Sequence, residues 1–444
     1  MYIRALVLLL GAALLGYLIY RIRPSRYGLT FGLLFVDLPL LERLPLNIAP
    51  GVNLVTIFLV ALCGLRLKAD GPSPGVDSSA FRNLLLAWLT VGVFGFIVGL
   101  TGALPPTDLV VLFKRWLDPL LFSLLALQLT RRQDQHFLLA CMLVGYAMVS
   151  LQGLREGLDI GDKQRIEGLI GQANELGAFL AMYAPVVLVS ALFLSKGLLR
   201  FALLGLLLLG AAALVYTESR ACLLALPIGL CLMLCASGRS GYGFVGLLLV
   251  TVIWAFPSLL PERVTARFEA TYKEDSLGTG VQLEESAASR IVIWQGALQM
   301  ASEHPLGIGF AQFSGEIRNY AAITKYASDA HNYYLLTWAE FGLIGFIVLL
   351  CLLYRMLANA WTLARHGPDH FARSLGLGLW ASLIATLVVN CFGSRLMDIQ
   401  VSTYLWVLSA VAATARDTVP EEDVETVIAV AQPREDAWGL RSYS

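Results

Sequence analysis

Long apolar runs that follow one another along almost the whole chain are the feature that most limits its fold. A helix needs about 20 mostly apolar residues to span a bilayer. Such runs fall near residues 3–20, 29–41, 52–65, 84–104, 109–129, 137–154, 176–194, 198–216, 221–236, 242–260, 333–354, 375–390 and 396–413. They predict an all-α polytopic integral membrane protein with twelve or thirteen transmembrane helices. The run at 29–41 is short enough to be re-entrant instead.

Composition excludes several classes of protein. With 57% hydrophobic and 14% charged residues, the chain is not an ordinary soluble protein. Lys plus Arg equals Asp plus Glu at 32 each, so the net charge indicates no nucleic-acid partner. The seven cysteines lie in or at the edge of apolar runs, without the paired spacing of a disulfide framework or a zinc site. The cysteines therefore suggest neither disulfide bonds nor a zinc site.

The distribution of basic residues orients the predicted helices. Cytoplasmic connections of membrane proteins carry an excess of Lys and Arg. The basic connections of this chain fall on one side, with Arg66, Lys68, Arg82, Arg131, Arg132, Lys196, Arg200, Arg239, Arg355, Arg365 and Arg373. The opposite, external side receives residues 155–171, the short turn 217–220 and the large loop 261–332.

Four segments follow from this topology. We expect nine or ten transmembrane helices in residues 1–260, a periplasmic loop in 261–332, three transmembrane helices in 333–413 and a cytoplasmic tail in 414–444. Within the loop, residues 289–300 have helical periodicity, with Ile291, Trp294, Leu298 and Ala301 roughly on one face. This pattern is typical of an amphipathic helix on a membrane surface. A turn at residues 305–310, Pro-Leu-Gly-Ile-Gly-Phe, ends the helix.

A polar sequence at the end of the loop places a histidine where water meets membrane. Asp329-Ala330-His331-Asn332-Tyr333-Tyr334 leads directly into the next apolar run. Such a histidine is also typical of an aromatic belt at the membrane interface. Arg220 and Arg290 lie on the same external side, where either residue can serve simply as a solvated or headgroup-anchoring charge.

Several motifs together resemble the bacterial O-antigen ligase and polymerase superfamily. They are Arg220 at the start of a helix, Arg290 in Ser-Arg-Ile-Val-Ile-Trp-Gln, the His-Pro-Leu-Gly-Ile-Gly-Phe turn, and His331-Asn332 followed by Glu-Phe-Gly-Leu-Ile-Gly at 340–345. Residues 174–180, Asn-Glu-Leu-Gly-Ala-Phe-Leu, also resemble a helix start in exopolysaccharide polymerases of this group. The resemblance covers mainly residues 220–345 and the overall helix plan.

The resemblance implies a GT-C-like fold and metal- and ATP-independent glycan transfer at the outer face of the inner membrane. The donor would be a glycan linked through pyrophosphate to undecaprenol. The acceptor would be a sugar hydroxyl, on lipid A–core or on a growing glycan. By position and context, Arg220, Arg290 and His331 match the essential residues of the superfamily.

The chemistry of these side chains agrees with that function. Guanidinium forks suit the oxygens of a departing pyrophosphate, and backbone N–H groups at a helix start add to an anion site. A histidine that titrates near neutrality can take the proton of an attacking hydroxyl. We therefore expect catalytic roles for His331, Arg220 and Arg290, in a single inverting displacement.

Further residues are candidates for substrate binding: Arg155, Arg165, Asn332 and Arg395. Arg155 and Arg165 belong to a second external basic patch, which can equally be a solvated surface. Arg395 lies in the external turn between the last two predicted helices. Glu340 is either a functional intramembrane carboxylate or a packing or capping residue.

Ligase and polymerase share donor and chemistry and differ only in acceptor, so the sequence leaves this choice open. A transporter or flippase is a weaker alternative, because transporters concentrate charges mid-bilayer at broken helices. Only the number of predicted helices favours a transporter, and similarity of fold says little about function. A non-catalytic assembly factor would leave the arginines and the histidine without a role.

Overall fold

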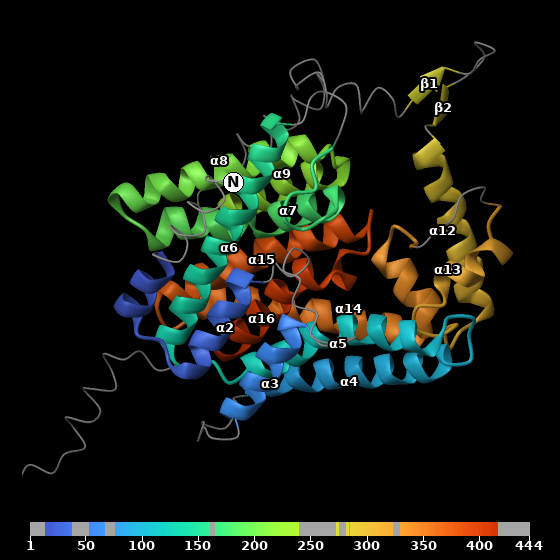
Figure 1. Ribbon diagram of the computed structural model, residues 1–444, viewed down its shortest axis with the longest axis horizontal. Coiled ribbons are helices and arrows are strands. Elements are labelled where there is room, and N and C mark those ends of the chain that lie inside the picture. Colours follow the sequence, from blue (N-terminus) through green and yellow to red (C-terminus); the bar gives the residue numbers. More distant parts are fainter. Residues whose placement is uncertain are drawn as a thin grey trace, which may run out of the picture.

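The computed structural model describes residues 14–37, 53–66, 76–159, 165–238, 272–274, 281–283, 285–322 and 329–415. Helices account for nearly all regular structure among these residues (Figure 1). Two short strands, β1 (Tyr272–Glu274) and β2 (Val281–Leu283), form an antiparallel pair. The predicted all-α membrane fold class is confirmed.

Six described helices are long and apolar enough to cross a membrane. They are α4 (Val76–Gly99), α6 (Arg132–Asp159), α7 (Ala173–Val189) continued by the π-helical turn η2 (Ser190–Leu194), α8 (Gly197–Thr217), α14 (Tyr333–His366) and α15 (His370–Asn390). Shorter apolar helices are α2 (Arg26–Asp37), α3 (Leu54–Arg66), α9 (Arg220–Ala236) and α16 (Ile399–Thr414). Helical structure also covers residues 14–22 and α5 (Pro106–Ala126). Each predicted apolar run overlaps one of these helices except residues 242–260, which lie outside the described residues.

The helices differ in how much of their surface is buried. Nearly every residue of α7 and α16 is buried within the bundle. Helices α4 and α8 lie at the periphery, where large apolar side chains such as Phe94 and Leu208 are exposed. Exposed hydrocarbon of this kind suits contact with lipid rather than water. The charges within α5 are partly neutralised in place, because the Lys114 ammonium lies 2.6 Å from the buried Asp118 carboxylate.

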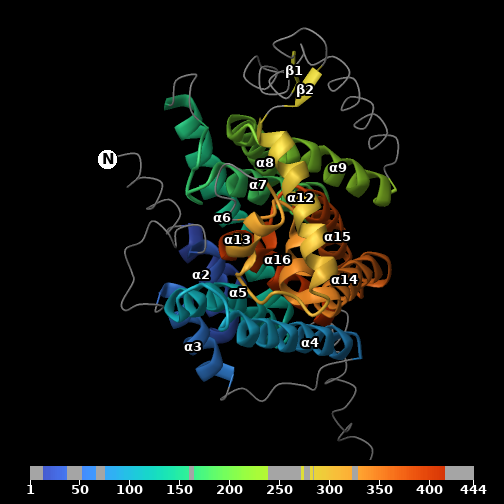
Figure 2. The ribbon, with the colours of Figure 1, turned by 90° about the vertical axis from the view of Figure 1, so that its right-hand side faces the viewer.

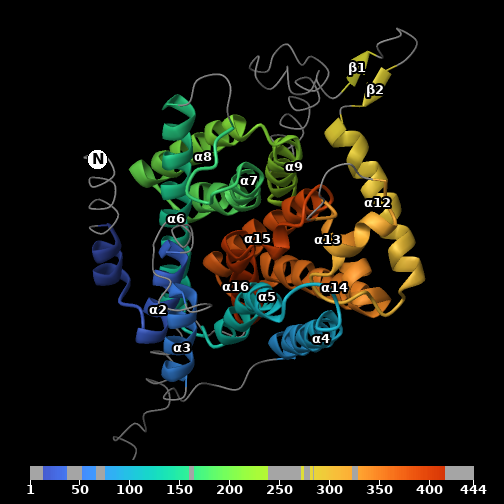
Figure 3. The same cartoon turned by 45° about the vertical axis from the view of Figure 1, so that its right-hand side comes forward.

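The helices also form two groups that lie on opposite sides of a boundary in the bundle. Figure 3 shows the green helices α7, α8 and α9 on one side of the orange and red helices α14, α15 and α16. Both α7 and α9 pack against α15, so the two groups share one continuous boundary. The segments that carry the predicted site residues lie at one end of this boundary.

Helix α12 (Glu285–Glu303) includes the predicted amphipathic helix, and it crosses the side of the bundle (Figure 2). On the predicted apolar face, Ile291 and Leu298 are 43% and 45% exposed and do not pack against the protein. The helix instead buries Ile293, Ala297 and Met300 in a cluster with α14 and the short helices α13 (Phe313–Glu316) and η4 (Ile317–Asn319). It therefore has two apolar faces, of which only one packs against the protein.

The predicted turn after α12 fits into a break in α14. The backbone of α14 is not helical at Gly342, where φ is 69° and ψ is −172°. The Gly309 N–H donates to the carbonyl of Glu340 (3.0 Å). The Leu343 N–H, in turn, donates to the carbonyl of Pro305 (2.9 Å). A Cβ at Gly342 would lie 2.4 Å from the Pro305 carbonyl oxygen, so this close approach requires glycine.

Glu340 has a structural partner at the same junction. Its carboxylate accepts a hydrogen bond from the Phe313 backbone N–H at the start of α13 (3.2 Å), and the side chain is buried. Of the two roles considered for Glu340, this contact matches capping and packing. The junction joins α14 to the turn after α12, and His331 lies just before the start of α14.

Candidate active site

A polar cavity of about 240 Å³ lies where the two helix groups meet α12. Its lining consists of Arg165, Asn174, Glu218, Ser219, Arg220, Ala221, Cys222, Arg290, His331, Val389, Phe392 and Arg395. The cavity thus brings together the three predicted catalytic residues, which are up to 111 positions apart (331 − 220). It also includes two of the four predicted substrate-binding residues, Arg165 and Arg395.

Arg220 reaches the cavity because a tight turn joins α8 to α9. Glu218 ends α8 in the left-handed conformation, with φ at 51°, and Ser219 precedes the first residue of α9. Helix α7 approaches this turn closely at Gly177, where a Cβ would lie 3.0 Å from the Thr217 hydroxyl oxygen. The start of α9 is therefore packed against α7, and Arg220 projects from a fixed helix end.

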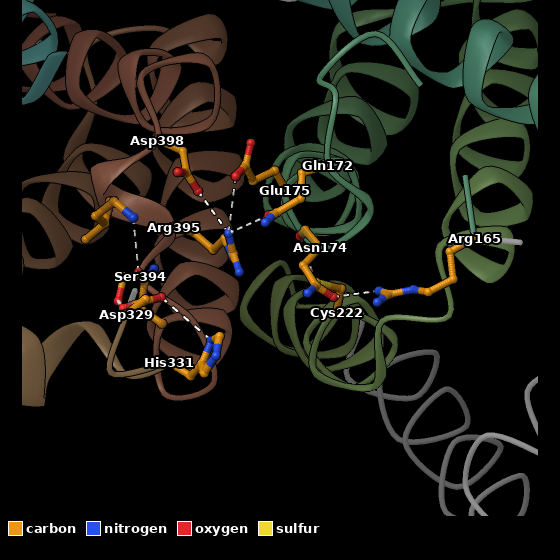
Figure 4. Close-up of polar contacts among 12 residues, drawn as sticks. Arg165, Gln172, Asn174, Glu175, Cys222, Asp329, His331, Ser394, Arg395 and Asp398 are labelled. Atoms are coloured by element: carbon orange, nitrogen blue, oxygen red, sulfur yellow. Dashed lines mark hydrogen bonds and ion pairs between the residues drawn. The ribbon is translucent and has the colours of Figure 1, made fainter. Parts of the chain in front are cut away.

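Arg165 is held by two hydrogen bonds at the cavity wall. Its Nε donates to the carbonyl of Thr217 (2.7 Å), and Nη2 donates to the side-chain oxygen of Asn174 (2.6 Å; Figure 4). The loop that carries Arg165 is itself tied to α6, because the Glu156 carboxylate accepts from the backbone N–H of Glu167 (2.9 Å). Arg165 therefore links α8, α7 and the preceding loop.

Arg395 lies on the opposite wall, in the short helix η5 (Arg395–Met397) between α15 and α16. It is buried, and Nη1 donates to Gln172 Oε1 and Asp398 Oδ2, each at 3.1 Å, with Glu175 Oε1 at 3.6 Å (Figure 4). Burial lowers the pKa of Arg395, but the carboxylates of Asp398, Glu175 and Asp329 raise it by more. The guanidinium thus joins the α15–α16 turn to the start of α7.

His331 occupies a constrained position before α14. Its backbone is left-handed, with φ at 51°, a conformation that few residues other than glycine adopt. The imidazole Nδ1 lies 3.7 Å from Asp329 Oδ2, while Asp329 Oδ1 accepts from the Ser394 hydroxyl (2.5 Å; Figure 4). The side chain is 38% exposed. The Asp329 carboxylate therefore faces the Nδ1 edge of the ring, and Nε2 lies on the opposite edge.

The surroundings of His331 favour the neutral ring. Burial lowers the pKa of His331 from its ordinary value of 6.5, the Asp329 carboxylate raises it, and the charges of Arg290 and Arg395 lower it. The net shift is downward. A neutral imidazole at pH 7 is the form that can accept a proton.

Arg290 enters the cavity from α12. One turn further along this helix, the Trp294 indole N–H donates to the carbonyl of Ala330 (3.0 Å), the residue before His331. The Trp294 ring also lies near Phe392, with ring centroids 6.5 Å apart. These contacts fix α12, and with it Arg290, against the segment that carries His331.

Two predicted substrate-binding residues do not line the cavity. Arg155 lies on α6, where its Nε is 3.7 Å from Asp159 Oδ2. The side chain of Asn332 caps α14 by accepting from the backbone N–H groups of Tyr334 and Leu335 (3.0 and 3.1 Å). Asn332 thus positions the helix that follows His331.

Sequence reasoning missed other lining residues, among them Asn174, Glu218, Ser219 and Cys222. The one available signal was Asn174, a polar residue at the start of a strongly apolar helix. Cys222 gives no such signal, because it lies within an apolar run like the other cysteines.

Part of the chain is similar to a known protein family. Residues 204–350, roughly a third of the chain, match the family model described as O-Antigen ligase. This stretch contains Arg220, Arg290 and His331, whereas Arg165, Asn174 and Arg395 lie outside it. No curated protein matches the chain. The match confirms the resemblance found in the sequence for residues 204–350, which are similar to O-antigen ligases. Together with the long apolar helices, it indicates a multi-pass membrane protein.

Proposed function

We propose that this protein transfers a glycan from an undecaprenyl-pyrophosphate donor to a sugar hydroxyl, without ATP or metal. The observation that carries this function is the meeting of His331, Arg220 and Arg290 in one polar cavity. They come from three separate segments: the start of α9, the helix α12 and the loop before α14. A family of lipid-linked glycan ligases and polymerases supplies the reaction class.

The transfer step is a single displacement. The acceptor hydroxyl oxygen forms a bond to the anomeric carbon while the bond from that carbon to the pyrophosphate oxygen breaks. The leaving pyrophosphate keeps the electron pair, and His331 Nε2 takes the proton of the hydroxyl. Attack from the face opposite the leaving group inverts the anomeric centre. The donor is already activated, so no nucleotide is consumed.

The arginines are suited to the leaving group. Arg220 and Arg290 line the same cavity as His331 and would bind the oxygens of the pyrophosphate as its charge develops. Arg165 and Arg395 are held at the walls by hydrogen bonds to Asn174 and Gln172. They add positive potential to the cavity, and we expect them to contribute to donor binding.

The excess of Lys and Arg in the connections predicted to be cytoplasmic supports a cavity that opens toward the periplasm of a bacterial inner membrane. A lipid-linked donor would enter from the membrane, and the exposed apolar residues Ile291 and Leu298 of α12 would lie at the membrane surface.

Reconstitution tests the reaction class. Purified protein in proteoliposomes is supplied with undecaprenyl-pyrophosphate glycan and an acceptor, with a chelator present and no ATP. We expect a glycan–acceptor product and release of undecaprenyl pyrophosphate. Movement of the intact donor across the bilayer with no product would instead indicate a transporter.

The acceptor is tested by gene deletion in the native host. Loss of glycan attachment to lipid A–core, with lipid-linked polymer accumulating, would identify a ligase. Surface glycans reduced to single repeat units would identify a polymerase.

A further inference from the structure

A second charged cavity lies at the end of the bundle opposite the candidate active site. Helix α9 begins at Arg220 in the active site and ends at Ala236 beside this cavity, about 24 Å away at 1.5 Å per residue. The second cavity has a volume of about 430 Å³. Its charged and polar walls come from the end of α14 and the first turns of α15: Trp361, Arg365, His370, Arg373 and Ser374.

The two guanidinium groups of this cavity carry charge that the described part of the chain does not neutralise. Arg365 stacks over the Trp361 ring, with 4.4 Å from its Cζ to the ring centroid. Arg373 Nε donates to the backbone carbonyl of Asp369 (3.4 Å). The Asp369 carboxylate itself is engaged by Arg132 at 2.7 Å. Among the described residues, neither Arg365 nor Arg373 has a carboxylate within ion-pair distance, so the cavity suits an anion.

A large apolar cavity adjoins the charged one. It has a volume of about 1200 Å³ and lies between residues 14–22, α6 and α8. Phe193 and His370 line both cavities, so the two spaces meet at these side chains. Leucine and alanine side chains such as Leu143, Leu206 and Ala202 form the apolar walls. The combination of a basic end and an apolar channel matches a molecule with an anionic head and hydrocarbon chains.

We propose that these joined cavities bind an anionic glycerophospholipid from the membrane leaflet at this end of the bundle. Arg365 and Arg373 bind the headgroup phosphate, because guanidinium groups form charge-assisted hydrogen bonds with phosphate oxygens. The acyl chains enter the apolar cavity. Basic pockets between transmembrane helices on the cytoplasmic side recognise lipid headgroups in this way. The site is separate from the proposed transfer reaction and holds whether or not that reaction is correct.

Native mass spectrometry of the purified full-length protein tests the headgroup contact. The protein is titrated with phosphatidylglycerol and with phosphatidylcholine of the same chains. We expect the anionic lipid to bind at least tenfold more tightly. A basic residue near a charged lipid surface contributes about 1 kcal/mol, so Arg365→Gln and Arg373→Gln should each weaken phosphatidylglycerol binding about fivefold. Arg131→Gln, an exposed arginine bonded to Gln133, is the matched control and should leave binding unchanged.

The apolar part is tested with Ala202→Trp, which places a large side chain in the apolar cavity, against Ala61→Trp on the exposed surface of α3. Only the first variant should weaken binding of the phospholipid. Equal affinity for the two lipids, or equal weakening by Arg131→Gln and Arg365→Gln, would overturn the site. If millimolar inorganic phosphate displaced phosphatidylglycerol, the acyl chains would not be bound in the apolar cavity. If undecaprenyl phosphate bound more tightly than phosphatidylglycerol, the ligand would not be a glycerophospholipid.

Discussion

His331 has an unusual backbone conformation, and the groups around it shift the pKa of its ring in opposing directions. Burial and the two arginines favour the neutral ring, whereas Asp329 favours the protonated ring. A base must be neutral before the reaction, so the balance matters more than any one contact. Since the net shift of the pKa is downward, transfer should lose rate only as pH falls below the ordinary histidine value.

Asp329→Asn tests this balance. Removing the carboxylate removes the influence that raises the pKa of His331, so the acidic limb of kcat/KM should move to lower pH. The rate on the plateau should also fall, because the ring loses the partner 3.7 Å from Nδ1. The measurement is the pH profile of glycan transfer, with Glu316→Gln as the control. If the acidic limb stayed in place or moved to higher pH, the Asp329 carboxylate would not be raising the pKa of His331.

Arg220→Lys tests the need for a planar fork at the start of α9. Lysine keeps the charge but loses bidentate geometry. Hydrogen bonds to charged groups contribute about 1.5 to 3 kcal/mol, so the KM for the donor should rise about tenfold or more while the KM for the acceptor stays the same. Arg318→Lys, at an exposed residue of helix η4, is the control. An unchanged donor KM would remove Arg220 from pyrophosphate binding.

Among the elements, the broken helix α14 directly follows the loop that carries His331, the proposed base. Its first turn is capped by Asn332, and its break at Gly342 receives the turn that follows α12. The helix therefore connects the loop of His331 to α12, which carries Arg290. Strain or displacement at the break should reach both residues.

Gly342→Ala tests the junction. The backbone region at φ 69° and ψ −172° is essentially restricted to glycine and costs other residues about 1–3 kcal/mol. A Cβ there would also meet Pro305. The thermal unfolding midpoint in detergent should fall by several degrees. Gly315→Ala is the matched control, since no heavy atom lies within 4 Å of its Cβ, and equal midpoints for the two variants would contradict the account.

The elements also show what sequence can predict. Transmembrane helices were predictable because length and hydropathy are local properties, and the described helices overlap the predicted runs. The buried face of α12 was not predictable from the sequence, because both faces of this helix are apolar. Only its contact with α13 and α14 determines which face is buried. The break at Gly342 was equally hidden, since it depends on hydrogen bonds to residues more than 30 positions earlier.

At the scale of the whole molecule, the candidate site exists only where separate parts meet. Arg165 comes from the loop before α7, Arg220 from the start of α9 and Arg395 from the α15–α16 turn. Arg290 and His331 come from α12 and the loop before α14. The resemblance identified Arg220, Arg290 and His331 by local motifs. Asn174 gave only the signal of a polar residue at the start of an apolar helix, and Cys222 gave none, because it is the packing of α7 against the α8–α9 turn that brings them to the cavity.

The most direct test of the central claim is the rate of glycan transfer by His331→Ala in proteoliposomes, measured beside donor binding. General base catalysis typically contributes about 10² to 10⁴-fold, so kcat should fall by that factor while donor binding is retained. His304→Ala, whose ring nitrogen contacts the Tyr320 hydroxyl at 2.9 Å on the exposed surface, should keep the wild-type rate. Full activity in His331→Ala, or an equal loss in His304→Ala, would contradict the assignment of His331 as the base.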